Sequence, residues 1–185
     1  GTIDEVVLTD YPLAVSQLSL LMKGFHSPAN INVKAFATKA PISWLSFNEG
    51  VGTSSGIGLK GDFTGSATWG DGVYGGGVKF SGAAVDMVEI ANSDTIDLSK
   101  SFTIGGWIRT AGSAGVTWLV SKNNVVGLGM EGSKPFVQVY EDGGNIVKVG
   151  SVTQAQTGTN NHIMAVFDGV KLTLYLNGKF VGSAA

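Results

Sequence analysis

The chain has 185 residues, of which 43% are hydrophobic, and a formal net charge of −2 at pH 7. This length and apolar fraction suit one all-β domain with a sizeable core, with or without an appendage. The lack of a basic run excludes a nucleic-acid footprint. No apolar stretch approaches the roughly 20 residues of a membrane-spanning helix. The absence of cysteine excludes disulfides and cysteine-ligated metals.

Glycine is abundant, with 28 residues against 4 prolines and 12 basic residues. A charge-poor chain rich in glycine, valine, isoleucine and threonine is typical of short strands joined by tight turns. The glycines have no three-residue period, which excludes a collagen-like helix. The composition therefore predicts an all-β fold.

Residues 1–24 differ from the rest of the chain. Residues 1–8 predict a short strand, and the apolar positions 14, 15, 18, 21 and 22 have helical spacing. Gly24 is placed as a C-cap for that helix. A linker is expected over residues 25–40, which contain Pro28 and several small residues.

Strands and turns alternate over residues 41–185, which we predict to be the main domain. The glycine-rich stretch 50–77 is expected to be a loop with at most one short strand. After it, two strands are expected to be joined by a turn at Ser81-Gly82. The expected strands of this part are residues 42–47, 78–80 and 85–90.

The segment Phe102–Ile108 has the pattern of a strand at the centre of a β-sandwich. Phe102, Ile104 and Ile108 alternate with smaller residues, as in a strand with at least one buried face. Asx-Gly pairs further along predict tight hairpin turns and an antiparallel meander. The strands expected after the centre are residues 116–120, 125–130, 136–141, 146–152, 162–167, 171–176 and 179–181.

Several segments, in the correct order, resemble laminin-G-like jelly-roll domains of the concanavalin A-like lectin/glucanase superfamily. They are Trp44-Leu-Ser-Phe-Asn-Glu-Gly-Val-Gly52, Gly75–Gly82 with Asp86–Ile90, Phe102–Ile108, and Ala165-Val-Phe-Asp-Gly169 followed by Leu174-Tyr-Leu-Asn-Gly178. The resemblance runs from Trp44 to about Val181. It implies an all-β fold, an antiparallel two-sheet β-sandwich jelly roll, here with one short N-terminal appended helix.

Residues 1–24 resemble the closing strand and helix of such a domain, but they stand at the front of this chain. The domain over 41–185 in turn lacks its last strands. Three arrangements remain open: a piece of a tandem array that begins with the tail of a preceding copy, a subunit whose leading strand completes a neighbour's sandwich, and a circular permutant. An open sandwich exposes unpaired strand edges, and a strand from another copy would pair with them.

The superfamily includes glucanases, whose retaining members carry two glutamates on one strand with an aspartate between them. Asp86 and Glu89 match the aspartate and the second glutamate, but Ala84 stands at the position of the nucleophile. A lone carboxylate cannot perform double displacement. We therefore predict no catalytic residues and no enzymatic activity, with a glycoside hydrolase relative as an alternative.

Many laminin-G-like jelly rolls bind calcium, so the resemblance implies a candidate calcium site at Asp4, Glu49 and Asp86. Calcium needs clustered oxygen ligands, and these acids would have to converge from distant segments. The alternative is that they face water or cap turns. Two departures weaken the transfer of binding residues: Ser81 replaces the family's turn aspartate, and Asn160–His162 keeps only the last residue of a Trp-His-His motif.

Sugar binding needs exposed aromatic rings beside polar side chains. Candidates that stand in or near expected loops are Trp69, Tyr74, Trp118 and Tyr140. Trp44 and Trp107 are expected in the core. An exposed tryptophan in a glycine-rich loop is equally suited to an assembly contact.

The resemblance implies a non-enzymatic module of an extracellular, cell-surface or virion-surface protein. Its expected partner is a glycan or surface glycoprotein, with calcium as the candidate cofactor, and its expected role is glycan or matrix recognition or adhesion within a tandem or assembled protein. The alternative is a structural subunit of a filament, phage tail or capsid decoration built by strand exchange between copies. Neither a nucleic-acid partner nor membrane insertion is expected.

Overall fold

The computed structural model describes residues 1–23, 39–52, 54–112, 114–141 and 143–185. One helix, α1 (Val15–Met22), lies among antiparallel strands. The strands are β1 (Thr2–Thr9), β2 (Ser43–Leu45), β3 (Ser54–Ser55), β4 (Ile57–Gly58), β5 (Gly61–Thr64), β6 (Thr68–Asp71), β7 (Gly76–Lys79), β8 (Met87–Ile90), β9 (Phe102–Arg109), β10 (Val116–Lys122), β11 (Val126–Glu131), β12 (Lys134–Tyr140), β13 (Ile146–Gly150), β14 (Asn161–Phe167), β15 (Leu172–Leu176) and β16 (Lys179–Ala184).

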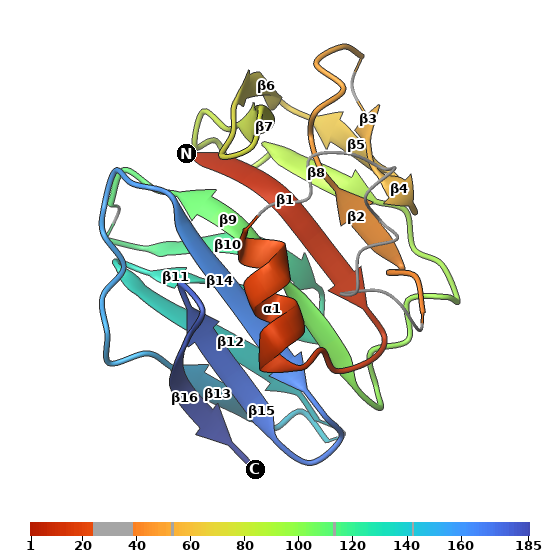
Figure 1. Ribbon diagram of the computed structural model, residues 1–185, viewed down its shortest axis with the longest axis vertical. Helices are drawn as coiled ribbons and strands as arrows, with labels where there is room; N and C mark the ends of the chain where they lie inside the picture. Colours follow the sequence, from red (N-terminus) through yellow and green to blue (C-terminus); the bar gives the residue numbers. More distant parts are fainter. Residues whose placement is uncertain (24–38, 53, 113, 142) are drawn as a thin grey trace.

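The strands form three sheets that pack as a sandwich. The nine-stranded sheet has the order β16-β15-β14-β9-β1-β2-β4, with β7 also paired to β1 and β6 paired to β7. A four-stranded sheet, β10-β11-β12-β13, lies behind it in the view of Figure 1, and a three-stranded sheet, β3-β5-β8, lies beside β2. The predicted antiparallel β-sandwich is therefore confirmed.

The main core fills the space between the sheets. It combines residues of the nine-stranded sheet, such as Ile104 and Leu174, with residues of the four-stranded sheet, such as Leu128 and Val137, and none of these four exposes measurable surface. Burying one such side chain contributes roughly 1.5–3 kcal/mol. The alternation of apolar and small residues in the sequence thus places one face of each strand in this core.

Strand β9 lies at the centre of the large sheet, as its sequence predicts. It pairs with β1 on one side and β14 on the other. Phe102, Ile104 and Ile108 are buried in the core. Gly106 permits close approach of β1, because a Cβ there would lie 3.0 Å from the carbonyl oxygens of Asp4 and Glu5.

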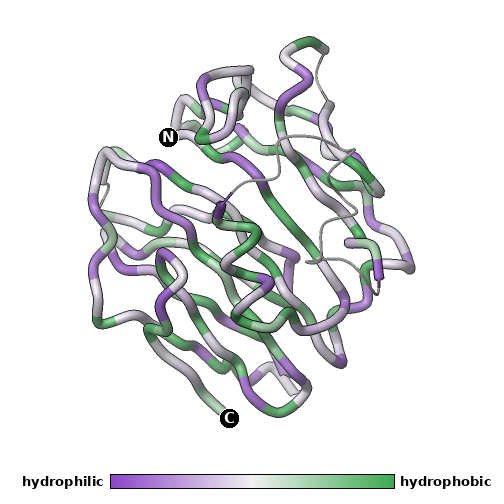
Figure 2. The backbone as a smooth tube through the Cα atoms, viewed as in Figure 1, coloured by the Kyte–Doolittle hydropathy of each residue, from purple (hydrophilic) through white to green (hydrophobic). Residues whose placement is uncertain are grey.

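Strand β1 lies inside the sheet of its own chain. It pairs with β9 along one edge and with β2 and β7 along the other. The second half of β1 is hydrophobic, and its residues Val6, Val7 and Leu8 are buried (Figure 2). The chain's own first strand therefore occupies a place in the sandwich.

Helix α1 covers the outer face of the large sheet, crossing in front of β14 and β9 in Figure 1. Leu18 and Leu21 are buried in a second cluster with Trp44, Met164 and Val166. The helix begins after Ala14, whose N–H donates to Oε1 of Gln17 at 2.7 Å. The predicted helix is confirmed, while the expected linker over 25–40 lies almost wholly outside the described residues.

Two sequence-based expectations differ from the structure. The strands on either side of Ser81-Gly82 were expected as a pair, but β7 joins the large sheet and β8 pairs with β5 in the three-stranded sheet. The carboxylate of Asp86 accepts hydrogen bonds from the N–H groups of Ser66 and Ser81 and from the Ser81 hydroxyl, which fixes this crossing between sheets. The stretch 50–77 contains β3, β4, β5, β6 and the start of β7 rather than at most one short strand.

Among the described residues, no helix is long and apolar enough to cross a membrane.

Replacing Ile104 by alanine should destabilise the fold by about 2–5 kcal/mol, because it opens a cavity beside a side chain with 0% exposure. Urea unfolding followed by tryptophan fluorescence measures the loss. The matched control is Val170→Ala, at a residue that is 76% exposed, where a change below about 0.5 kcal/mol is expected. Equal unfolding midpoints for Ile104→Ala and the unmodified protein would contradict this view of the core.

Candidate ligand-binding site

The outer face of the four-stranded sheet carries aromatic and polar side chains together. Along β12, Val137 and Val139 contribute to the core. Since side chains alternate along a strand, Phe136, Gln138 and Tyr140 project from the opposite face. Phe136 is 2% exposed yet does not belong to either core cluster, so other side chains of the outer face cover it.

Glycines of the neighbouring strand leave space on this face. Gly127 lies opposite Gln138, and Gly129 lies opposite Phe136. A Cβ on Gly127 would overlap the benzene ring of Trp118, so the indole lies directly over a backbone without a side chain. The Trp118 ring also meets Phe136 at 5.1 Å between centroids in a T-shaped arrangement. Trp118 is nevertheless 41% exposed, which makes it an accessible aromatic platform.

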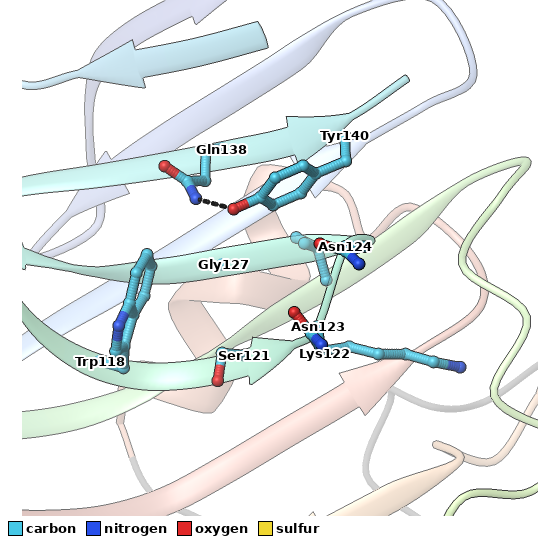
Figure 3. A pocket seen from close by; sticks show the side chains of 9 residues that line it. Trp118, Ser121, Lys122, Asn123, Asn124, Gly127, Gln138 and Tyr140 are labelled. Atoms are coloured by element: carbon cyan, nitrogen blue, oxygen red, sulfur yellow. Dashed lines mark hydrogen bonds between the residues drawn. The ribbon is translucent and has the colours of Figure 1, made fainter. Parts of the chain in front are cut away.

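A hollow of about 180 Å³ begins beside this platform, and we call it the Trp118 trough. It is lined by Trp118, Ser121, Lys122, Asn123, Asn124, Val126, Gly127, Gln138 and Tyr140. Figure 3 shows Trp118 at one end, Gln138 and Tyr140 along one side, and Ser121 along the other. The trough therefore combines one exposed indole with several amide and hydroxyl groups.

The polar groups of the trough are held by the surrounding turns and strands. Nε2 of Gln138 donates to the Tyr140 hydroxyl at 2.8 Å, which orients both side chains (Figure 3). Asn124 has a φ of 55° in the tight β10–β11 turn, a conformation that asparagine tolerates well. That turn is closed by the Val125 N–H, which donates to the Lys122 carbonyl at 3.0 Å. Asn123 and Asn124 are exposed at the rim.

The two lysines nearest the trough are engaged elsewhere. Nζ of Lys122 donates to the carbonyl of Ile96 at 2.9 Å, and its side chain points away from the other lining groups in Figure 3. Lys148 lies opposite Gln138 on β13, but its ammonium pairs with Glu131 at 2.9 Å and lies 4.4 Å from the centroid of Phe136. Apart from Lys122, the side chains that line the hollow are uncharged.

The four aromatic candidates from the sequence fall into two groups. Trp118 and Tyr140 line the same trough. Trp69 is half-buried instead, with its ring tilted against that of Phe63 at 4.7 Å between centroids, and it donates from Nε1 to the Gly52 carbonyl at 2.8 Å. Tyr74 is also half-buried, and its hydroxyl donates to the carbonyl of Met22 at 2.6 Å.

The three candidate calcium ligands occupy different settings. Asp86 anchors the turn described above, and its pKa is lowered chiefly by the Ser81 hydroxyl. The exposed Glu49 accepts from the Ser55 hydroxyl at 2.7 Å and from the Gly56 N–H at 3.2 Å. Asp4 is 1% exposed within β1. Within the described ranges, no group of three or more acidic, histidine or cysteine residues is arranged to hold a metal ion.

Two consecutive buried acids, Asp4 and Glu5, interrupt the apolar pattern of β1. Of the two, only Asp4 was a candidate site residue from the sequence. The register with β9 shifts between Asp4 and Val7, and Glu5 adopts a φ of 50° in this bulge. Glu5 is 6% exposed, and its carboxylate accepts from Nε1 of Trp44 at 2.6 Å and from Nδ2 of Asn48 at 3.5 Å. Consecutive acids in an apolar strand were the signal that a bulge was needed.

Burial controls the protonation of this pair. Burial, and next the neighbouring charge of Asp4, raise the pKa of Glu5 to about 8. Burial also raises the pKa of Asp4, although backbone N–H groups of Tyr74, Val73 and Glu5 donate to its carboxylate and oppose the shift. A proton on Glu5 thus avoids two adjacent buried negative charges at neutral pH.

Comparisons with known proteins agree with this architecture. The family model of the concanavalin A-like lectin/glucanases superfamily matches residues 81–185, more than half of the chain. The crystal structure of the binding domain of Paraclostridial Mosquitocidal Protein 1 is similar in fold, with a TM-score of 0.61 and 15% sequence identity. That similarity covers 69% of this chain and 36% of the other, so this chain spans little more than a third of the other's length. No curated protein matches the chain.

Stability should fall as the pH rises from 6.5 to about 8. Folded Glu5 binds its proton more tightly than unfolded Glu5, whose pKa is 4.5, so the folded state loses this advantage as the pH approaches 8. Below pH 6.5 the buried His162, whose pKa burial lowers to about 4, contributes with the opposite sign. Between pH 6.5 and 8 the contribution of Glu5 therefore outweighs that of His162. Thermal unfolding at several pH values measures the slope.

The variant Glu5→Gln should flatten this slope and raise the melting temperature at pH 8, because its amide oxygen still accepts from Trp44 but carries no charge. The control is Glu89→Gln, at an exposed residue of β8, which should leave the slope unchanged. A Glu5→Gln protein with the original slope would contradict the assignment.

Proposed function

Since the chain belongs to the concanavalin A-like lectin/glucanases superfamily, we propose that it is a non-enzymatic glycan-recognition module that binds its ligand in the Trp118 trough. The observation that carries this proposal is the exposed indole of Trp118 beside uncharged amide and hydroxyl groups. The structural neighbour, itself the binding domain of a mosquitocidal protein, supports a recognition role.

The chemistry of a pyranose ring fits such a surface. One face of the ring presents C–H groups, which pack favourably on an electron-rich indole. Its edge presents hydroxyls, which exchange hydrogen bonds with amides such as Gln138 and Asn123. Binding sites commonly combine apolar walls with a few polar groups that fix orientation. The trough supplies both on a rigid sheet, so little ordering entropy is lost on binding.

A structural role is the alternative function. Val116, Trp118 and Ile146 are 47%, 41% and 52% exposed, and all three belong to the four-stranded sheet. Exposed apolar residues of this size also suit a contact between proteins. In this alternative, copies of the chain meet as subunits of a filament, phage tail or capsid decoration. Sedimentation of the purified protein would then reveal oligomers in the absence of any glycan.

Catalysis is not part of the proposal. Ala84, at the nucleophile position, lies in an exposed turn, and Asp86 is occupied by its turn contacts. Glu89 is exposed on β8, with Asp62 of β5 directly opposite in the register. Hydrolysis of a glycan by the unmodified protein, lost in the Glu89→Gln variant, would instead support a glycosidase relative.

Any calcium site at Asp4, Glu49 or Asp86 would be separate from the trough, because all three residues lie outside its lining. Titration of chelator-treated protein with calcium chloride by calorimetry tests for the ion. A location on the outside of a cell or virion, where glycans are displayed, is proposed together with the glycan-binding function.

Binding to a glycan array should depend on the trough. Trp118→Ala removes the platform, and Gly127→Ala pushes the indole from its place because the new Cβ overlaps the ring. Each should weaken the affinity for the best array glycan at least about tenfold, equivalent to about 1.4 kcal/mol. Calorimetry with that glycan measures the affinity.

The matched control is Gly150→Ala, on the same sheet face opposite Phe136, where a new Cβ meets nothing within 4 Å. It should bind normally, and thermal unfolding should show that all three variants fold. Full affinity in both Trp118→Ala and Gly127→Ala would remove the trough from the proposal. If no glycan on the array bound the protein and sedimentation showed oligomers, the structural alternative would be favoured.

A further inference from the structure

Resting on the proposed function, we infer that the Trp118 trough selects neutral sugars and rejects glycans whose recognised unit carries a carboxylate or sulfate. The charges around the hollow determine this class of ligand. This selection is independent of which neutral sugar binds.

The lysines at and beside the hollow hold their ammonium groups against other partners. Lys122 is the one charged side chain that lines the hollow, and its ammonium donates to the Ile96 carbonyl. Lys148, on the adjacent strand, is paired with Glu131 and lies over Phe136. An anionic group seated on Trp118 would therefore lose hydration and gain an ionic partner only by drawing one of these ammonium groups from its present contact, which is costly.

The uncharged groups instead match sugar hydroxyls. An amide presents both donors and acceptors, as a hydroxyl does, so Gln138 and Asn123 can exchange hydrogen bonds with a neutral ring in either direction. Gln138 already donates to Tyr140 at 2.8 Å, which leaves its amide oxygen as an acceptor. A carboxylate accepts only, so it could use the remaining N–H and O–H donors but would leave the Gln138 amide oxygen without a donor.

The size of the hollow limits the recognised unit. A volume of about 180 Å³ lies below the roughly 300–1,000 Å³ of sites that enclose a drug-sized ligand. The open trough has room for about one sugar ring, with the remainder of a longer glycan outside it. Selection by charge thus acts on a single ring.

Methyl glycosides that differ only at C6 provide the test. The probes are methyl β-glucoside and methyl β-galactoside, each paired with the corresponding uronide, which carries a carboxylate in place of the CH₂OH group. The ¹⁵N–¹H resonance of the Trp118 indole, assigned with Trp118→Phe, follows binding at millimolar concentrations. We expect at least one neutral glycoside to shift this resonance, with its uronide at least about tenfold weaker.

A charge variant makes the test reciprocal. Ser121→Lys places a cation on the side of the trough opposite Gln138 and should strengthen binding of the matched uronide at least about tenfold, whereas Gly150→Ala should leave both affinities unchanged. Binding of a uronide to the unmodified protein as tightly as its neutral partner, lost in Trp118→Ala, would overturn the charge selection and keep glycan recognition. Failure of every glycoside and of the glycan array would overturn both. Array binding that survives Trp118→Ala would overturn the trough while keeping glycan recognition elsewhere.

Discussion

The pairing of β1 with β9 joins the two halves of the large sheet. Among the strands that the structure describes, β14, β15 and β16 connect to β2, β4, β6 and β7 only through β9 and β1. Without β1, the facing edges would leave buried backbone groups unpaired, at a high free-energy cost. Helix α1 then covers the same region, because Leu18 and Leu21 pack with Val7 of β1. The first 22 residues therefore complete both the sheet and its outer cover.

This cover determines where a ligand can bind. The large sheet is buried on one face by the core and over part of the other by α1, whereas the four-stranded sheet keeps its outer face toward solvent. An antiparallel sheet with one solvated face is a suitable platform for recognition. On that face, Gly127 makes room for an indole over the backbone, and Phe136 supports its edge. Packing demands thus hold Trp118 in place and leave much of it accessible.

The positions of the strands and the helix along the chain were predicted better than the pairing of the strands into sheets. Hydrophobic alternation and Asx-Gly turns were sufficient to locate β9, the β10–β13 meander and the final hairpins, and helical spacing located α1. Pairing depends on contacts across long stretches of chain, so the separation of β7 and β8 into different sheets was missed. Short strands in the glycine-rich stretch have too few side chains for a periodic pattern. Trp118 and Tyr140, which line the trough, were selected by residue type alone, but the hydrogen bonds made by Trp69 and Tyr74 appear only in three dimensions.

The most direct test of the central claim is a crystal structure of the protein bound to the neutral glycan that ranks first on an array. We expect one sugar ring stacked on the indole of Trp118, with its hydroxyls within hydrogen-bond distance of Gln138 and of the asparagines in the β10–β11 turn. A glycan bound at the glycine-rich loops around Trp69 and Tyr74, with the Trp118 trough empty, would contradict it.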